Sequence, residues 1–513
     1  MEERLMTSSQ IGIMISIVAY LAIVVIIGVI FSKRTKNVGD FYLGGRKLGP
    51  LVTAMSAEAS DMSSWLLMGL PGVAYLTGVA DAGWTAIGLA VGTYFNWLIV
   101  AKKLRNYSAK IGAITIPDFF SQRYKDEKKV LMALAALVII IFFVPYTASG
   151  FAACGKLFGT LFGVDYHIAM VISAIIIVGY TSLGGFNAAS TTDFIQSIIM
   201  SIALGIVLVY GISQAGGVGA VADNAKSLSG YLGMFSTHDP ETGQAVSYGF
   251  LTVVSTMAWG LGYFGMPHIL LRFMAIENPD KVKLSRRVAT VWVVISMAVA
   301  VLIGIVGLGM VKKGSLGALE DSETIIVQIA NLLATHGILP ALIAGVILAG
   351  ILASTMSTAD SQLLAASSSA SENILGGLFN LKLSETAQMV VARVTLIVIS
   401  VIGVIVAWNK DSSVFKIVSF AWAGFGAAFG PVMLLALFWK RSNKYGAIAG
   451  MVVGGAMIFI WKFVIAKLGG AFAIYELLPA FIIALVVNVI VSLITPAPEK
   501  EITDAFEEVK ATK

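Results

Sequence analysis

Charged residues are scarce in this sequence. They make up 12% of its 513 residues, whereas 58% are hydrophobic and the mean hydropathy is +0.88. Soluble domains carry about 25% charged residues, so the composition excludes an ordinary soluble protein and indicates a polytopic membrane protein. The net charge of +6 does not indicate nucleic-acid binding, because Lys and Arg lie mostly in short loops between apolar runs.

Residues that bind soft metals or form cross-links are equally few. Cys154 is the single cysteine, which excludes a disulfide framework, an iron–sulfur centre and a cysteine zinc site. The four histidines show no metal-ligand spacing: His167, His238, His268 and His336. No pairing of a nucleophile with a base is recognisable, so we expect a protein that is not an enzyme.

The sequence is rich in long apolar runs. About thirteen of them reach the roughly 20 residues that a membrane span needs. We therefore expect an all-α polytopic membrane protein with one transmembrane domain, residues 1–496, and a tail, 497–513. The first run is longer than a signal-peptide core and lacks a cleavage site. The runs lie near 9–31, 50–76, 83–102, 129–154, 166–184, 191–213, 248–270, 288–311, 338–364, 387–407, 414–438, 445–466 and 473–495.

Basic residues are dense in four loops, which alternate with loops poor in Lys and Arg, and this pattern predicts an orientation. By the positive-inside rule the basic loops are cytoplasmic. The N-terminus is then expected outside the cell (plasma) membrane and the tail in the cytoplasm. The basic loops are 32–49, 102–129, 271–287 and 440–444.

Two of the runs contain helix-breaking residues. The second holds SAEASDMSS, with the carboxylates of Glu58 and Asp61, and the seventh holds WGLGYFGMPH, with three glycines and Pro267. Unpaired backbone at membrane depth survives only where it is buried in protein or lines a cavity. The breaks are five runs apart, as in an inverted repeat whose second unit starts from the opposite side. Two ordinary kinked helices would give the same pattern. The matching positions of the two breaks, however, favour a binding site.

The ninth run carries a polar face that could bind a cation. In a helix, the Ser354 carbonyl lies beside the hydroxyls of Ser357 and Thr358, and Ser361 continues the face. Together with carbonyls freed at the break of the second run, between residues 59 and 62, these neutral oxygens suit a monovalent cation. Ca²⁺ sites usually hold several carboxylates, and softer metals prefer His or Cys. Alternatively, the hydroxyls bond only to carbonyls of their own helix.

Aromatic residues with polar edges occur near the same breaks. Such residues can enclose a small, partly apolar solute, and the amides of Ser63 and Ser64 at a helix start suit a carboxylate. The pattern favours a small amino acid, although tryptophan and tyrosine also form interfacial belts. The candidate pocket residues are Trp65, Tyr146, Trp259 and Tyr263.

Four further polar residues within the runs are harder to place. Asp193 is expected either as an interfacial N-cap or as a functional charge, and Asp360 either supports the cation site or faces the cytoplasm. Glu58 is expected to face the cytoplasm, and His268 to pack at the membrane interface.

Six segments are long and distinctive: FYLGGRKLGP (41–50), ASDMSSWLLMGLPG (59–72), ITIPDFF (114–120), WGLGYFGMPHILLRFMA (259–275), MSTADSQLL (356–364) and SFAWAGFGAAFGP (419–431). Through them nearly the whole chain resembles the sodium/solute symporter family, and within it the sodium/proline symporters. The resemblance implies a LeuT-like inverted repeat of two five-helix units, 50–213 and 248–438. Extra helices at 9–31 and 445–495 would flank it.

The resemblance also implies a function and its residues. It implies Na⁺-coupled symport of L-proline into the cell by alternating access, and we expect the protein to act as a monomer. The implied Na⁺ ligands are the carbonyls of Ala59, Met62 and Ser354 and the hydroxyls of Ser357 and Thr358. The implied proline pocket comprises Asp61, Ser63, Ser64, Trp65, Tyr146, Trp259 and Tyr263. Arg46 and Asp193 match positions important for coupling, to which we add Asp360.

Three residues depart from the common pattern of the proline symporters. Glu58 and Ser64 stand where glycine is common, and Met266 stands where glutamine is common. These departures leave another small amino acid, a zwitterion or a monocarboxylate open as the substrate. A channel would show conductance without saturable uptake, and a sensor would need a signalling domain; we expect neither.

Overall fold

The computed structural model describes residues 7–32, 38–379, 381 and 384–511, most of them helical. Residues 33–37 of the first predicted basic loop lie outside this described part. Within the described residues, ten helical segments are long and apolar enough to cross a membrane, which identifies a multi-pass membrane protein. They correspond to all or part of α1 (Ser8–Ser32), α5 (Val79–Phe95), α8 (Val130–Phe162), α9 (Tyr166–Gln214, from Gly185 onward), α13 (Val282–Lys313), α15 (Ile338–Ser368), α16 (Glu385–Val406), α17 (Val414–Phe438), α18 (Lys444–Phe463) and α19 (Leu477–Ile494).

The described part of the chain also contains shorter helices. Several are apolar pieces of the predicted runs, and others lie in the connections. They are α2 (Val38–Leu43), α3 (Pro50–Asp61), α4 (Leu70–Thr77), α6 (Lys102–Lys110), α7 (Ile116–Arg123), α10 (Val218–Ser227), α11 (Phe250–Met257), α12 (Pro267–Ala275), α14 (Ile325–Ala334) and α20 (Lys500–Ala511).

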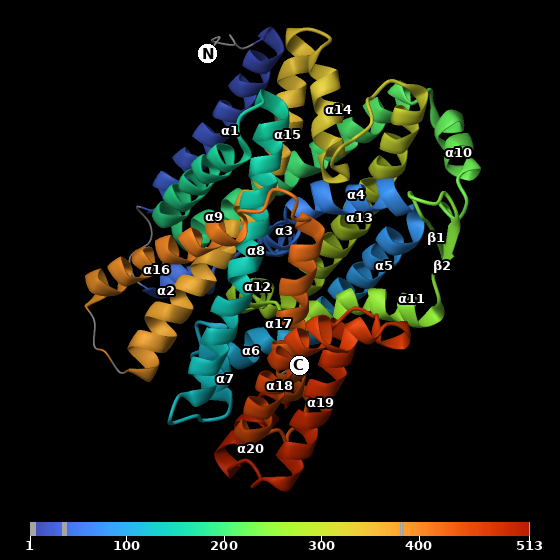
Figure 1. Ribbon diagram of the computed structural model, residues 1–513. Coiled ribbons are helices and arrows are strands. Elements are labelled where there is room, and N and C mark those ends of the chain that lie inside the picture. Colours follow the sequence, from blue (N-terminus) through green and yellow to red (C-terminus); the bar gives the residue numbers. More distant parts are fainter. Residues whose placement is uncertain (1–6, 33–37, 380, 382–383, 512–513) are drawn as a thin grey trace.

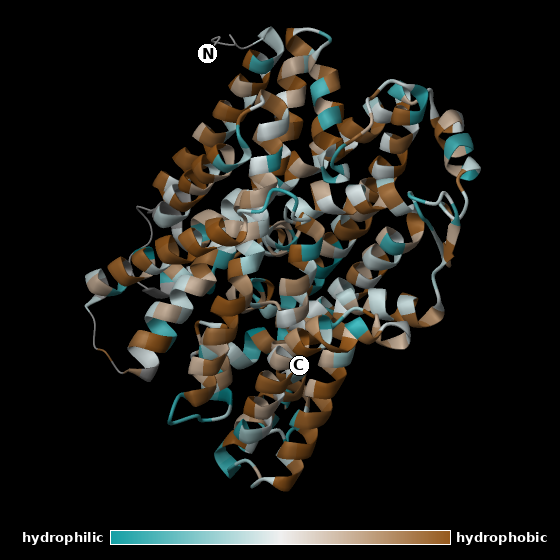
Figure 2. Cartoon of the chain, viewed as in Figure 1, coloured by the Kyte–Doolittle hydropathy of each residue, from teal (hydrophilic) through white to brown (hydrophobic). Residues whose placement is uncertain are grey.

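The long helices surround α3, which lies near the centre of the molecule (Figure 1). In the same view the start of α1 and helix α20 lie at opposite ends. Apolar residues colour the outer faces of the helices, and hydrophilic residues gather mainly in the connections (Figure 2). Exposed Ile15, Val398 and Ile490 on α1, α16 and α19 belong to these apolar faces. Such side chains suit contact with lipid tails, because a helix surrounded by hydrocarbon gains nothing from a polar outer face.

The all-α prediction needs one correction. The connection between α10 and α11 contains a small antiparallel hairpin of β1 (Ser236–His238) and β2 (Ala245–Ser247). Its turn is closed by the Asp239 side chain, which accepts hydrogen bonds from Glu241 N and Thr242 Oγ1. Three-residue strands leave too short a pattern of alternating residues for sequence periodicity to reveal them.

The fifth and sixth predicted runs correspond to two helical parts of α9 (Tyr166–Gln214) that meet at a kink. Helix α9 covers both, and Gly185, with φ of 66° and ψ of −175°, kinks it between them. Glycine adopts this left-handed φ at little cost, so the helix changes direction without a loop. The glycine-rich stretch that separated the two predicted runs therefore produces a kink.

The second and seventh predicted runs are each divided into pieces. Helix α3 ends at Asp61, Met62 has a non-helical ψ of 65°, and the chain continues through a π-helical segment, Trp65–Gly69, into α4. The seventh run passes from α11 through a 3₁₀ segment, Ala258–Phe264, to α12. Both transitions place irregular backbone inside the protein.

Glycines let the interrupted seventh run pack closely against α5. A methyl group added at Gly92 would overlap the Gly260 carbonyl oxygen, and one at Gly88 would lie 2.5 Å from the Met257 carbonyl oxygen. Small residues permit such backbone contact in membrane proteins, where close packing replaces the hydrophobic effect. Helix α5 thus holds the 3₁₀ segment beside the end of α3.

One buried carboxylate links three elements near the start of α17. Glu323 accepts hydrogen bonds from Val414 N at 2.9 Å and Phe415 N at 3.1 Å, which are backbone groups at the N-terminus of α17. The same side chain pairs with Lys156 Nζ of α8 at 2.7 Å, and Lys156 lies 2.8 Å from Asp321. A carboxylate suits this position because helix N-termini carry partial positive charge.

We predict that Glu323→Ala destabilises the protein far more than Asp321→Ala. The first change leaves the buried Lys156 charge and the α17 amides without their main partner, at a cost of about 3–5 kcal/mol. The second removes a 38% exposed carboxylate, whose loss costs roughly 1 kcal/mol or less. Thermal unfolding of the purified variants in detergent measures the difference, and equal melting temperatures would contradict it.

Candidate functional site

The candidate site is built around the end of α3. Three donors converge on the Asp61 carbonyl oxygen: Ser63 N at 2.8 Å, Trp65 Nε1 at 3.1 Å and the Tyr146 hydroxyl at 3.2 Å. A carbonyl at a helix C-terminus has no partner within its helix, so these contacts replace the missing helical bonds. They also tie Tyr146 of α8 to the site.

One side of this helix end faces α15. Ser357 Oγ lies 2.8 Å from the Ala59 carbonyl oxygen and 3.1 Å from the Ser354 carbonyl oxygen. Thr358 Oγ1 is also 3.1 Å from the Ser354 carbonyl. The structure thereby brings together four of the five predicted cation ligands, from segments nearly 300 residues apart in sequence. The fifth, Met62, is fully buried and directly follows α3.

The other side of the helix end faces aromatic residues. The Tyr263 hydroxyl donates to Asp61 Oδ2 at 2.6 Å, and the rings of Trp65 and Trp259 lie 6.0 Å apart. Ser63 Oγ accepts a hydrogen bond from Trp65 N at 3.4 Å, whereas the buried Ser64 Oγ has no partner among the described residues. Apart from Ser64, the predicted pocket residues are therefore linked by hydrogen bonds or ring contacts around the end of α3.

Three aromatic residues that sequence reasoning missed complete this cluster. Trp422 of α17 donates to the Trp259 carbonyl oxygen at 2.7 Å and packs edge-on against Tyr263. Phe415 and Tyr475 contact the Trp259 ring at 5.4 and 5.3 Å between ring centroids. Trp422 lies within one of the distinctive segments, SFAWAGFGAAFGP. That position is the sequence signal by which Trp422 could have been identified.

Asp193 is buried, so its prediction as an interfacial N-cap is wrong. It is 0% exposed within α9, and its Oδ2 accepts hydrogen bonds from Ser56 Oγ at 2.6 Å and Arg272 Nη2 at 3.1 Å. Arg272, on α12, also donates to Ser361 Oγ at 2.5 Å. This buried ion pair joins α3, α9, α12 and α15 below the candidate site, and sequence reasoning did not single out Arg272.

The other two predicted coupling residues lie apart from the Asp61 contacts. Arg46 donates to the carbonyls of Met274 and Ala113 and to Ser108, which ties the segment before α3 to α6 and α12. Asp360 is 1% exposed and accepts from Ser361 Oγ at 3.1 Å. Asp360 thus does not face the cytoplasm, and it joins the Arg272 cluster through Ser361.

Two further polar residues of the interrupted runs are buried. Glu58 does not face the cytoplasm, as was expected: it is 1% exposed, and its Oε1 accepts from Trp97 Nε1 at 2.9 Å. His268 is packed inside the protein: it is 0% exposed, and its ring lies near those of Phe143 and Tyr146. Both residues line the inner face of an interrupted run.

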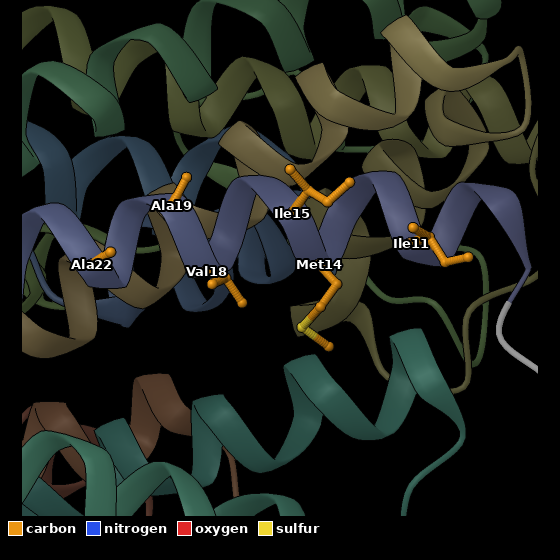
Figure 3. Close-up of a pocket in the computed structure, with 6 residues that line it drawn as sticks. All are labelled: Ile11, Met14, Ile15, Val18, Ala19 and Ala22. Carbon is orange, nitrogen blue, oxygen red and sulfur yellow. The ribbon is translucent and has the colours of Figure 1, made fainter.

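The outer groove of about 430 Å³ on α1 is a different kind of surface. Six apolar side chains line it: Ile11, Met14, Ile15, Val18, Ala19 and Ala22 (Figure 3). These residues offer no polar atoms beyond the backbone of a regular helix. The groove suits lipid chains, and the polar contacts at α3 remain the candidate site.

The fold and the site together define a polytopic helical membrane protein with an internal polar site at an interrupted helix. The model of the sodium:solute symporter family matches residues 41–454. The chain belongs to the sodium:solute symporter family.

Curated relatives are similar over almost their full length. The chain is 42% identical to the high-affinity proline transporter PutP of Bacillus subtilis (strain 168), covering 95% of this chain and 99% of that protein. It is 40% identical to the osmoregulated proline transporter OpuE of the same strain, covering 96% of each. It is 38% identical to a sodium/proline symporter of Staphylococcus aureus, covering 94% of this chain and 93% of that protein.

Solved structures share the fold at low identity. A Na⁺-coupled sialic acid symporter in a substrate-bound outward-open state superposes with a TM-score of 0.78 at 19% identity, covering 95% of this chain and 99% of that one. Mhp1, a nucleobase-cation-symport-1 family transporter in a closed conformation with bromovinylhydantoin bound, superposes with a TM-score of 0.55 at 14% identity. This superposition covers 92% of this chain and 99% of the Mhp1 chain.

We predict strong coupling between Asp193 and Arg272 in a double-mutant cycle. Asp193→Asn or Arg272→Gln alone leaves one buried charge unpaired and costs about 3–5 kcal/mol. The double variant removes both charges and should cost clearly less than the sum of the two. Chemical or thermal unfolding in detergent provides the values, and additive single effects would rule out the buried ion pair.

Proposed function

We propose that this protein carries out Na⁺-coupled symport of L-proline into the cell by alternating access. The observation that supports it best is the contact between Ser357 Oγ of α15 and the Ala59 carbonyl at the end of α3, at 2.8 Å. This contact places neutral oxygens of two helices beside Asp61. An ion and a solute can then bind at the same interruption of the helix. The naming of three curated relatives as proline transporters supports the solute.

In this proposal Na⁺ binds the carbonyls of Ala59, Met62 and Ser354 and the hydroxyls of Ser357 and Thr358. Such a set offers five oxygens without formal charge. It suits a singly charged hard cation, because Ca²⁺ usually demands several carboxylates. The Ser357 hydroxyl now donates to a carbonyl; on binding it would turn its lone pairs to the ion.

Proline occupies the opposite side of the α3 end in this proposal. Its carboxylate lies at the backbone of Ser63 and Ser64, and its ring packs among the aromatic side chains. Asp61 lies between the two ligands. The polar and aromatic residues concerned are Asp61, Ser63, Ser64, Trp65, Tyr146, Trp259 and Tyr263. Aromatic rings with polar edges, beside backbone amides and one carboxylate, match a small amino acid with an apolar body.

The proposal includes the finer architecture. We infer that the chain crosses the membrane about thirteen times. Residues 50–213 and 248–438 form two inverted repeats, and the first helix of each repeat is interrupted. The N-terminus lies outside and the tail inside, and the protein works as a monomer. Arg46 and Asp193 act in coupling by holding moving helices together, a role that their contacts with α6 and α12 support. Asp360 acts in coupling through Ser361, which also accepts from Arg272.

The main alternative is another small zwitterion or monocarboxylate. The observation that favours it is Met266, which is fully buried at the start of α12 and offers no amide to a solute. Competition of labelled proline uptake by a panel of unlabelled amino acids, betaines and monocarboxylates separates the candidates. Proline should compete at the lowest concentration.

We predict Na⁺-driven proline uptake into proteoliposomes and its abolition by Asp61→Ala. The membrane potential alone contributes about 2.3 kcal/mol per charge per 100 mV, so one Na⁺ can drive roughly fiftyfold accumulation. The matched control is Glu277→Ala, which removes only a surface ion pair with Lys281. Uptake that is independent of Na⁺, or wild-type uptake by Asp61→Ala, would refute the proposal.

We predict that Ser357→Ala combined with Thr358→Ala raises the Na⁺ concentration for half-maximal uptake by at least about tenfold. Each lost hydroxyl removes an ion contact worth on the order of 1 kcal/mol. Thr355→Val is the control, because Thr355 is on the same helix but donates to the Ile351 carbonyl, which is not a proposed Na⁺ ligand. An unchanged Na⁺ dependence in the double variant would disprove the cation site.

A further inference from the structure

Tyr475 contacts the aromatic side of the candidate site from outside the two repeats. It belongs to the connection between α18 and α19, residues 464–476, which runs beside α11 (Figure 1). Its ring is stacked on that of Trp259, with 5.3 Å between the centroids and 23° between the planes. Trp65, Phe415 and Trp422 also surround the Trp259 ring, at 6.0, 5.4 and 6.2 Å, but they are less nearly parallel to it. Tyr475 is the member of this group that the two repeats do not supply.

Two hydrogen bonds hold Tyr475 in this position. Its backbone N donates to Ser255 Oγ of α11 at 2.7 Å, and its hydroxyl donates to the Ser419 carbonyl oxygen of α17 at 2.8 Å. The next residue, Glu476, forms an ion pair with Lys462 of α18 at 2.9 Å. A tyrosine of an interfacial belt turns its hydroxyl toward the lipid headgroups, whereas this hydroxyl is bonded to the backbone of α17. The contacts with α11, α17 and α18 therefore determine where the Tyr475 ring lies.

The Tyr475 ring lies between an exposed connection and a buried pocket residue. Leu468 and Phe472 of the same connection are 72% and 47% exposed, whereas Trp259 is 3% exposed. Tyr475 itself is partly buried. A stacked partner covers one face of an aromatic ring and favours one orientation of it. Removal of the Tyr475 ring would therefore uncover Trp259 and allow its indole to turn.

We propose that Tyr475 is a positioning residue of the solute pocket, which covers Trp259 and fixes the orientation of its ring. The inference rests on the proposed function, in which Trp259 is one wall of the proline pocket. The helices α18 and α19 thereby take part in solute binding although they lie outside both repeats. The affinity for Na⁺ does not depend on this contact, because the proposed Na⁺ ligands lie on the other side of the α3 end, around Ala59 and Ser357.

Proline uptake into proteoliposomes at saturating Na⁺ tests the effect on solute binding. Tyr475→Leu should raise the KM for proline about fivefold, the loss expected for one aromatic pair, and leave the maximal rate unchanged. Tyr475→Phe keeps the stacked ring and should restore most of the affinity. The matched control is Phe472→Leu, in the same connection, whose described ring contact is with Trp461.

Three transport results would overturn the inference. The first is an unchanged KM for proline in Tyr475→Leu, and the second is an equal rise of the KM in Phe472→Leu. The third concerns Na⁺: at saturating proline, the Na⁺ concentration for half-maximal uptake should be the same in Tyr475→Leu as in the wild type. A rise in that concentration as large as the rise in the KM for proline would show a general distortion of the site.

Quenching of tryptophan fluorescence by acrylamide tests the same contact without transport. In purified full-length protein without solute, the emission of Trp259 is the difference between each protein and its counterpart that also carries Trp259→Phe. This emission should be more strongly quenched in Tyr475→Leu than in the wild type, because the covering ring is lost, and unchanged in Phe472→Leu. Equal quenching of Trp259 in the wild type and Tyr475→Leu would overturn the inference.

The two readouts separate failure of this inference from failure of the proposed function. If wild-type protein takes up no proline with Na⁺, the proposed solute is wrong, and the quenching result decides the role of Tyr475. If uptake is normal and the KM of Tyr475→Leu is unchanged, the inference fails and the proposed function stands. If Tyr475→Leu does not fold, Ser255→Ala replaces it. Loss of the hydrogen bond to Tyr475 N should then raise the KM for proline, and a wild-type KM would overturn the inference.

Discussion

The structure depends on one constraint: backbone groups inside a membrane protein must find partners within the protein, because no water surrounds them. The end of α3 meets this constraint with side chains. The Asp61 carbonyl takes donors from its own turn and from Tyr146 of α8, and the Ala59 carbonyl takes Ser357 of α15. Each partner fixes the position of another helix. A break that would be costly in isolation therefore becomes the point at which three helices meet.

Close packing and buried ion pairs hold the elements around this point. Gly88 and Gly92 allow α5 to contact the 3₁₀ segment, which brings Tyr263 within 2.6 Å of Asp61. Below the site, Arg272 binds Asp193, and near the start of α17 Lys156 binds Glu323. Lipid offers helices no hydrophobic reason to associate, so small residues and polar contacts carry much of their cohesion. These contacts can also be exchanged during a transport cycle, because each joins elements that belong to different helices.

Much of the candidate site was predictable because its signals are local. The serine face of α15 follows from helical spacing, and the interruption after Asp61 follows from polar residues in an apolar run. Contacts such as Arg272 with Asp193 were not predictable, because the partners are 79 residues apart and either charge could have been interfacial. Glu58 was misplaced for the same reason: its partner, Trp97, belongs to another helix. The hairpin β1–β2 was missed because its strands are too short to show a period.

The sequence by itself determined that this is a multi-pass helical membrane protein, because apolar runs of this length have no other stable environment. It also determined the two interruptions and the family, since both reside in contiguous segments. Only the tertiary structure decided which polar groups face one another. It placed Ser357 against Ala59, Tyr263 against Asp61, and Trp97 against Glu58. Those pairings depend on how helices distant in sequence pack, which no local pattern encodes.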